Sequence, residues 1–164
     1  MLADKDLISI QEARNLVVAA RQAQQKWMHS DQMTVDRICE AMADAAYLAA
    51  DRLGRAAAEE TGYGVPAHKK IKNEFASRMV WESIRNVKTV GVVRTDPARG
   101  LHEIAWPMGV VVAFVPSTNP TSTAIYKILI AIKARNAIII SPHPSAKQCT
   151  YDAVDVMAKA AVAA

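Results

Sequence analysis

Residues 110–144 read VVVAFVPSTNPTSTAIYKILIAIKARNAIIISPHP, and this stretch decides the fold. Two runs rich in valine and isoleucine, residues 109–115 and 136–141, enclose a segment with helical spacing of apolar residues from Thr121 to Ala134. Continuous apolar runs are typical of strands that are covered on both faces. A strand, a crossover helix and a second strand predict a βαβ unit, whose strands are parallel and whose crossover is right-handed. The stretch therefore predicts an α/β fold.

The residues before this stretch predict three helices. Ser9 and Glu12 have the capping-box spacing that opens a helix. A second helix is expected over residues 34–60 with a break near Gly54, and a third over residues 67–86. Their apolar residues recur at helical spacing and are expected to face the core. They are Ala13, Leu16, Val17 and Ala20, then Ile38, Ala41, Met42, Ala45 and Leu48, and then Ile71, Phe75, Met79, Val80 and Ile84.

The pattern divides the chain into three parts. Residues 1–88 are helical, and residues 89–106 predict a β-hairpin with Pro97 and Gly100 at its reversal. Residues 107–164 hold the βαβ unit and a last helix. The final residues, DVMAKAAVAA, lie in the middle of an apolar helical pattern, and two buried strands need partner strands. We therefore expect the opening part of a longer α/β protein, or a module that docks onto another protein.

Composition narrows the class of protein. Hydrophobic residues make up 51% and charged residues 22% of the 164 residues, which is typical of a globular domain. The apolar runs are too short to span a bilayer, and the N-terminus lacks the features of a secretory signal, so we expect a cytoplasmic protein without membrane contact. Cys39 and Cys149 have no metal-ligand spacing, so no metal site is expected and both should be buried free thiols.

The net charge of +4 is a feature shared with many nucleic-acid-binding proteins. The tight basic group is His68, Lys69, Lys70 and Lys72. No aromatic residues interleave there in the way that base stacking requires. This group therefore predicts a solvated helix face and no nucleic-acid partner.

Polar residues gather after both predicted strands, at the edge where open α/β sheets bind ligands. The first corner places Ser117, Thr118 and Asn119 above the sheet, and the helix that follows opens with hydroxyls and free N–H groups. The second corner holds His143 between two prolines. An ordinary turn and helix cap would explain the first corner equally well, and His143 is either a surface residue or a ligand contact. No Gly-x-Gly-x-x-Gly phosphate loop is present.

Lys127 lies inside the crossover helix at the spacing of its apolar residues. Its side chain either snorkels from a buried face or brings a cation toward the polar corners.

The stretch AWPMGVVVAFVPSTNPTSTAIYKILIAIKARNAIIISPHPSAK, residues 105–147, resembles the N-terminal part of the aldehyde dehydrogenase superfamily. PSTNPTST, KARNAI and SPHP indicate its CoA-acylating branch, which includes the aldehyde dehydrogenase half of bifunctional alcohol/aldehyde dehydrogenases and the propionaldehyde, succinate-semialdehyde and sulfoacetaldehyde dehydrogenases. Residues 1–88 match the family's helical lead-in. The fold implied is N-terminal helices, a β-hairpin and the start of a Rossmann-like parallel sheet.

The resemblance implies oxidation of a small aldehyde to an acyl-CoA. A cysteine thiolate attacks the carbonyl, hydride passes to NAD or NADP, and coenzyme A takes the acyl group. The family's nucleophilic cysteine lies beyond residue 164, and neither Cys39 nor Cys149 has its context. We therefore expect the activity to belong to a longer parent enzyme, with the catalytic domain absent here and the 164 residues inactive alone. Residues 89–106 resemble the family's oligomerisation segment, which implies a homo-oligomer, in the cytoplasm or in a bacterial microcompartment.

The resemblance also implies roles for individual residues. The Asn119 amide is the expected donor to the oxyanion, with Thr118 as its rival, because hydrolytic relatives carry Asn-(Phe or Tyr)-Pro and alignment on Pro120 puts Thr118 in the place of their asparagine. Those relatives carry Lys-Pro-Ser at the second corner, where this chain has Ser-Pro-His, so NAD and NADP both stay open. The implied cofactor-binding residues are Val115, Pro116, Ser117, Thr118, Lys127, Ser141, Pro142 and His143.

Two other interpretations remain from the sequence. One is a catalytically inactive module that binds nucleotide or docks onto a full-length homologue. The other is a helical interaction protein whose polar corners serve only as helix caps.

Overall fold

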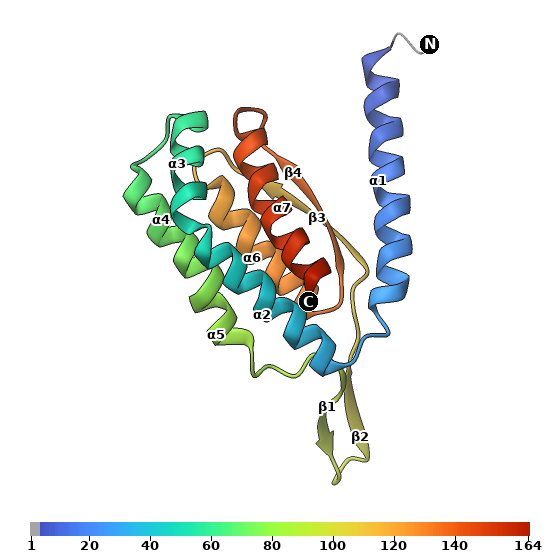
Figure 1. The fold of residues 1–164 in the computed structure, drawn as a ribbon. Helices are drawn as coiled ribbons and strands as arrows, with labels where there is room; N and C mark the ends of the chain where they lie inside the picture. The colour runs from blue at the N-terminus through green and yellow to red at the C-terminus, as the bar shows by residue number, and fades with distance from the viewer. Residues whose placement is uncertain (1–3) are drawn as a thin grey trace.

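The computed structural model describes residues 4–164, in which helices pack against a two-stranded parallel sheet and a hairpin projects from its base (Figure 1). The N-terminal half is helical, as the sequence predicts. Its helices are α1 (Lys5–Trp27), α2 (Gln32–Leu48), α3 (Ala50–Thr61), and a continuous rod made of α4 (Pro66–Glu74), the π-helix η1 (Phe75–Met79) and α5 (Val80–Ile84).

The predicted βαβ unit is present in the second half. β3 and β4 are parallel and stay in register along their whole length, and α6 connects them. A short 3₁₀ turn, η2, follows β4 and leads into the last helix. The elements are β3 (Val110–Val115), α6 (Pro120–Lys133), β4 (Ala137–Pro142), η2 (Pro144–Ala146) and α7 (Lys147–Ala163). The α/β fold is therefore confirmed.

The predicted hairpin is also present. β1 (Gly91–Asp96) and β2 (Leu101–Ala105) are antiparallel, and their register shifts between Val92 and Arg94. Gly100 closes the reversal with a φ of 63°, in the left-handed region that glycine adopts without strain. In Figure 1 the hairpin extends away from the helices. The residues of both its strands are exposed or half-buried.

The core lies on one side of the parallel sheet. α6 packs against both strands, and α2 and α7 pack against α6 and against each other. Full burial of a Leu or Ile side chain contributes about 2 kcal/mol to folding. The largest fully buried apolar side chains of this core are Val35, Leu53, Ile125, Leu129 and Met157.

Residues 4–164 cover one face of β3 and do not supply the cover that the sequence predicts for its other face. Ala113 and Val115 are buried under α6, whereas Val112 and Phe114 on the other face of the pleat are 52% and 76% exposed. α1 runs along this second face, and its contacts with the sheet are mainly to β4. Residues 4–164 thus provide a complete layer over one face of β3 and leave the other open.

Aspartates begin the first two helices, so both start earlier than predicted. The Asp4 carboxylate accepts a hydrogen bond from the N–H of Asp6 at 2.9 Å, and Asp31 accepts one from the N–H of Thr34 at 2.8 Å. Both are N-cap contacts, which lower the free energy of a helix start by about 1 kcal/mol. Ser9 therefore lies inside a helix and is not its cap.

The break between α2 and α3 lies at Ala49 and not near Gly54. Gly54 is buried where α3 crosses α4, and a Cβ at that position would lie 2.8 Å from the backbone nitrogen of Lys70. The glycine allows a close helix–helix approach and does not end a helix.

The predicted buried face of the helix over residues 67–86 is correct at its end, where Val80 and Ile84 pack against the core, and wrong before it. Ile71, Phe75 and Met79 are 60%, 63% and 48% exposed. The buried side of the rod instead carries the polar residues Lys69, Asn73 and Ser77, together with Ala76 and Trp81. The polar side chains are tolerated there because each has hydrogen-bond partners in the structure.

The predicted apolar faces of α1 and α2 need correction as well. Leu16 and Val17 of α1 are 55% and 45% exposed, and Leu48 at the end of α2 is 83% exposed. Met42 is buried as predicted. The neighbouring buried positions of α2 are Val35, Cys39, Ala43 and Ala46.

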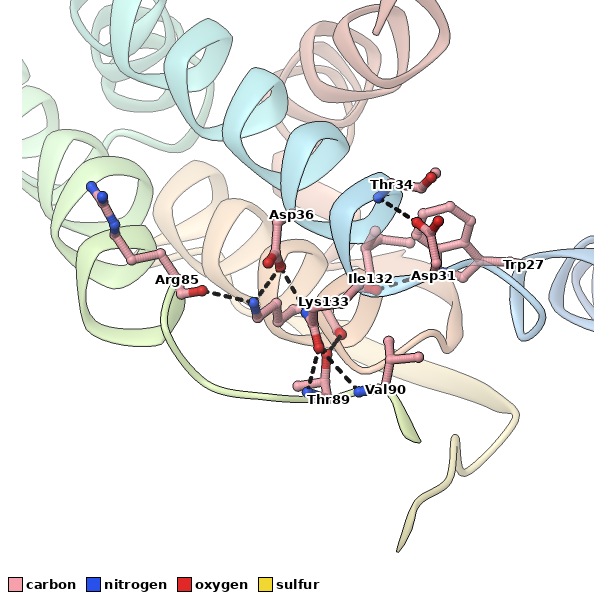
Figure 2. Close-up of polar contacts among 10 residues, drawn as sticks. Trp27, Asp31, Thr34, Asp36, Arg85, Thr89, Val90, Ile132 and Lys133 are labelled. Atoms are coloured by element: carbon pink, nitrogen blue, oxygen red, sulfur yellow. Dashed lines mark hydrogen bonds and ion pairs between the residues drawn. The ribbon is translucent and has the colours of Figure 1, made fainter. Parts of the chain in front are cut away.

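A polar cluster joins α2, α5, α6 and the base of the hairpin (Figure 2). The Lys133 ammonium, 3% exposed, donates to the carboxylate of Asp36 and, at 3.0 Å, to the carbonyl of Arg85. The Thr89 hydroxyl donates to the Lys133 carbonyl at 2.7 Å, and the N–H of the Trp27 indole donates to the carbonyl of Ile132 at 3.2 Å. These contacts hold the start of the hairpin against the core.

Candidate active site

The two polar corners lie side by side at the carboxyl edge of the sheet. The N–H of His143 donates to the carbonyl of Val115 at 2.9 Å, so the backbone of the second corner is bonded to the end of β3. Pro116 is exposed and Ser117 is half-buried. The structure therefore brings together the residues that the sequence analysis placed at one edge.

Asn119 is the N-cap residue of α6, but its side chain does not cap the helix. Within the described residues, its Oδ1 atom accepts a hydrogen bond from the Lys72 ammonium at 2.8 Å, and no N–H of α6 reaches it. The Asn119 carbonyl accepts from the N–H of Thr123 at 3.2 Å. The polar loop is thus tied to α4 by a side chain that the sequence analysis assigned to solvent.

Lys69 makes a second tie between α4 and the loop. Its side chain is 4% exposed, and its ammonium donates to the carbonyl of Thr118 at 2.7 Å. Burial lowers the pKa of this ammonium, and the positive charge of Lys72 lowers it further. A buried cation held on a backbone carbonyl fixes the orientation of the peptide that leads into Asn119.

Buried hydrogen bonds support the first turn of α6 from below. The Thr121 hydroxyl donates to Oδ1 of Asn73 at 2.8 Å, and the Asn73 amide donates to the carbonyl of Ala50 at 3.0 Å. Thr121 and Asn73 are 1% and 0% exposed. Satisfied buried networks of this kind restrict side-chain and backbone motion, so the loop above them has a rigid base.

An open groove of about 600 Å³ lies beside Asn119, between α4, η1 and α6. Phe75, Val80 and Tyr126 supply apolar walls, and Asn119 and Lys72 supply polar groups at one side. Such a groove suits a small, mostly apolar molecule with one polar end. The apolar residues that the sequence analysis assigned to the core, Ile71 and Phe75, are among those that line it.

Lys127 reaches the outer edge of β3. Its ammonium donates to the carbonyl of Phe114 at 2.7 Å, and the side chain is half-buried. The ammonium therefore lies against the backbone of the sheet. The cation is held at the end of β3, just before the loop.

The second corner is stiffened by its own contacts. The Nδ1 atom of His143 accepts a hydrogen bond from the N–H of Ser145 at 3.2 Å and is 2.8 Å from the Ser145 hydroxyl. Because Nδ1 is an acceptor, the neutral ring carries its proton on Nε2, and the residue as a whole is exposed. Ser141 and Pro142, at the end of β4, are half-buried beside it.

Glu60 of α3 caps the start of α7 next to this corner. Its two carboxylate oxygens accept from the N–H groups of Gln148 and Cys149 at 2.9 and 2.7 Å. Burial by itself would raise the pKa of Glu60, but these hydrogen bonds outweigh it and lower the pKa. The N-terminus of α7 is thus already occupied by a carboxylate.

The two thiols are buried, as predicted, and are poor nucleophiles. Burial raises the pKa of Cys39 to about 12, and burial followed by the nearby Glu60 carboxylate raises the pKa of Cys149 to about 12. The thiolate is the reactive form of cysteine, so both side chains are unreactive near neutral pH.

Two further features concern residues 4–164. In this part of the chain, no group of three or more His, Cys, Asp or Glu side chains is placed to hold a metal ion. No helix there is long and apolar enough to cross a membrane.

The sequence analysis missed Lys69, Lys72 and Asn73 as residues of the site. Lys69, Asn73 and Ser77 recur every four residues on one side of the rod, which is the helical spacing of a single face. This polar stripe lies opposite the apolar one, and it is the sequence feature from which a polar buried face could have been predicted. The prediction that Lys69 belongs to a solvated face is wrong.

The sequence and the structure both match known proteins. Residues 2–164 match the aldehyde dehydrogenase family. The chain belongs to this family. The resemblance to its CoA-acylating branch is also confirmed, since acetylating aldehyde dehydrogenases are among the similar proteins.

Three similar proteins illustrate the match. The bifunctional aldehyde-alcohol dehydrogenase of Escherichia coli is 44% identical over 156 residues, which are 95% of this chain and 18% of that protein. An acetylating aldehyde dehydrogenase from Geobacillus thermoglucosidasius is 51% identical with a TM-score of 0.94, covering 98% of this chain and 36% of that one. An engineered glycolyl-CoA reductase with bound NADP+ is 29% identical with a TM-score of 0.72, covering 90% of this chain and 33% of that one.

This chain therefore spans less than a fifth of the E. coli protein and about a third of the two solved structures.

Proposed function

We propose that this chain forms the N-terminal part of the active site of a CoA-acylating aldehyde dehydrogenase. The enzyme oxidises a small aldehyde to an acyl-CoA with NAD or NADP as hydride acceptor. The observation that carries the proposal is the place of Asn119. It lies at the carboxyl edge of a parallel sheet, where ligands bind in such folds, and on the wall of an apolar groove.

In this proposal Asn119 donates a hydrogen bond to the oxyanion that develops on the aldehyde oxygen when the nucleophile attacks the carbonyl carbon. Its Oδ1 atom is bonded to Lys72, which leaves the Nδ2 group as the donor. The groove beside it would take the apolar part of the aldehyde. A fixed donor at a developing oxyanion stabilises the transition state by a few kcal/mol.

The remaining expected contacts concern the dinucleotide. Val115 to Thr118 would lie beside the nicotinamide, and Ser141, Pro142 and His143 beside the adenosine. Lys127 would hold the end of β3 through Phe114. NADP+ in the similar glycolyl-CoA reductase and the acetylating activity named for the Geobacillus enzyme support a nicotinamide cofactor and coenzyme A.

The nucleophile is proposed to come from a segment outside the 164 residues. The raised pKa values of Cys39 and Cys149 support this part of the proposal, because neither thiol supplies a thiolate at neutral pH. In such an enzyme the hairpin, residues 89–106, would contribute to contacts between subunits. The alternative is an inactive module that binds nucleotide or docks onto a longer homologue.

A chimera tests the proposal. This chain replaces the matching segment of the Geobacillus acetylating enzyme, which is 51% identical to it. We expect NADH or NADPH formation that requires both acetaldehyde and coenzyme A, and a loss of about 100-fold in kcat for Asn119→Ala. A folded chimera with no CoA-dependent activity would contradict the proposal, as would activity of the 164-residue chain alone. Calorimetry of the chain with NAD+, NADP+ and coenzyme A tests directly the alternative that the chain is a nucleotide-binding module.

A further inference from the structure

Two lysines of α4 hold the loop before α6 from one side. Lys69 donates to the Thr118 carbonyl at 2.7 Å, and Lys72 donates to Oδ1 of Asn119 at 2.8 Å. We infer that Lys72 is a positioning residue that turns the Asn119 amide so that its NH₂ group faces the groove as a donor. This inference rests on the proposed function, because it assigns a partner to the residue that the proposal places at the oxyanion.

The direction of the amide follows from the chemistry of the ammonium group. A lysine ammonium has three donors and no acceptor, so only the oxygen of the Asn119 amide can face it. The nitrogen then lies on the other branch of the amide, away from Lys72.

The position of Asn119 gives this contact a competitor. An asparagine at an N-cap normally turns its side-chain oxygen to the N–H groups of the first helical turn, because these have no partner within the helix. Asn119 is the N-cap of α6, and in the described structure its oxygen makes no such bond. Lys72 thus diverts the amide from a capping role. Without Lys72, we expect the oxygen to turn to the N–H of Thr121 or Ser122 and the NH₂ group to leave the groove.

Lys69 acts on the same loop through the backbone. It is 4% exposed and holds the Thr118 carbonyl, so the peptide between Thr118 and Asn119 has one orientation. Asn119 lines the groove and the Thr118 side chain does not. The geometry therefore favours Asn119 over Thr118 as the donor.

A double-mutant cycle in the chimera with the Geobacillus enzyme tests the inference. Lys72→Met should lower kcat about tenfold with little change in KM for the aldehyde, since it removes the orientation of a transition-state donor. On an Asn119→Ala background, Lys72→Met should have no further effect on kcat, because the amide that Lys72 orients is gone. Lys72→Arg keeps a donor and should restore most of the activity.

Lys70→Met is the matched control. Lys70 lies on the same helix and pairs with Glu74 at 3.7 Å, without contact to the loop, so its loss should leave kcat unchanged. Equal losses from Lys72→Met on both backgrounds would overturn the inference. So would a large loss for Thr118→Val with none for Asn119→Ala.

A second measurement does not depend on activity. In the 164-residue chain, the side-chain NH₂ resonances of Asn119 should shift in Lys72→Met and stay in place in Lys70→Met, as read by ¹⁵N NMR. An unchanged Asn119 amide in Lys72→Met would overturn the inference even if the chimera were active. A shifted amide in an inactive, folded chimera would support the contact and contradict the proposed function, so the two failures are distinguishable.

Discussion

Burial raises the pKa of the two thiols well above its usual value. The stability of the folded protein should therefore fall at alkaline pH. The pKa of Cys39 and of Cys149 rises from 9.0 in the exposed state to about 12 in the folded state. Above pH 9.0 the unfolded chain releases these protons and the folded chain keeps them. The stabilisation is therefore complete below about pH 9 and is lost as the pH rises toward 12.

The expected loss is about 1 kcal/mol per thiol at about pH 10. Urea unfolding at about pH 8 and about pH 10 measures it. Lysines and tyrosines also titrate in this range, so the comparison is with the variant Cys39→Ala/Cys149→Ala, which has no thiol to titrate. That variant should lose less stability between the two pH values than the parent chain. An identical loss would show that the thiols titrate normally in the folded state.

Lys133 gives a second prediction at the scale of a residue (Figure 2). Its ammonium is 3% exposed, whereas the Asp36 carboxylate is 34% exposed and also accepts from Gln32 at 2.8 Å. Asp36→Asn leaves a buried cation without its anion and should cost about 3 kcal/mol. Lys133→Met keeps most of the volume, and the carboxylate can be hydrated, so it should cost about 1 kcal/mol. Chemical denaturation measures both costs. A larger loss of stability for Lys133→Met than for Asp36→Asn would contradict the interpretation of Lys133 as a buried cation that needs Asp36.

At the scale of an element, Gly54 sets how closely α3 approaches α4. A methyl group in its place would lie 2.8 Å from the backbone nitrogen of Lys70, and backbone cannot move as a side chain does. Gly54→Ala should therefore destabilise the protein by about 2 kcal/mol, although alanine is the better helix former. Arg55→Ala is the control, because this exposed side chain forms a surface ion pair with Asp51 and its removal should cost less than about 0.5 kcal/mol. Thermal unfolding separates the two outcomes, and a neutral Gly54→Ala would mean that α4 moves away freely.

The kinds and order of the elements could be predicted from the sequence, because they follow from local patterns. The change from helical spacing to Val and Ile runs located the sheet, and Pro97 with Gly100 located the hairpin. The faces of the helices could not be predicted, because an apolar stripe does not tell what it contacts. In the rod that contains α4, the stripe of Ile71 and Phe75 lines the groove, and the buried side is polar.

The same limit applies to the candidate site. The edge of the sheet and the residues after β3 were predictable from topology. The partners of that loop, Lys69 and Lys72, lie about 50 residues earlier in the chain, and no local pattern pairs them with it. Long-range contacts of this kind depend on how α3 and α4 pack.

At the scale of the whole molecule, Arg135 joins three parts that lie far apart in the sequence. It lies in the turn between α6 and β4, 7% exposed, with a φ of 59° that is unusual for a residue with a side chain. Its guanidinium donates to the carbonyl of Met28 after α1 at 2.6 Å and to that of Ala105 in β2 at 3.0 Å. One side chain thus fastens both the long N-terminal helix and the hairpin to the parallel sheet.

Removal of this guanidinium should loosen the two attachments and leave the core intact. In Arg135→Ala, we expect faster amide hydrogen exchange over residues 27–31 and 89–106, with no change in α6 and α7. Arg135→Gly loses the same contacts but relieves the left-handed backbone, so it should be about 1 kcal/mol more stable than Arg135→Ala while showing the same exchange pattern. Arg94→Ala, which removes a pair within the hairpin only, should leave residues 27–31 unaffected. Unchanged exchange in the hairpin of both Arg135 variants would show that other contacts, such as that of Thr89 with Lys133, are sufficient to hold it.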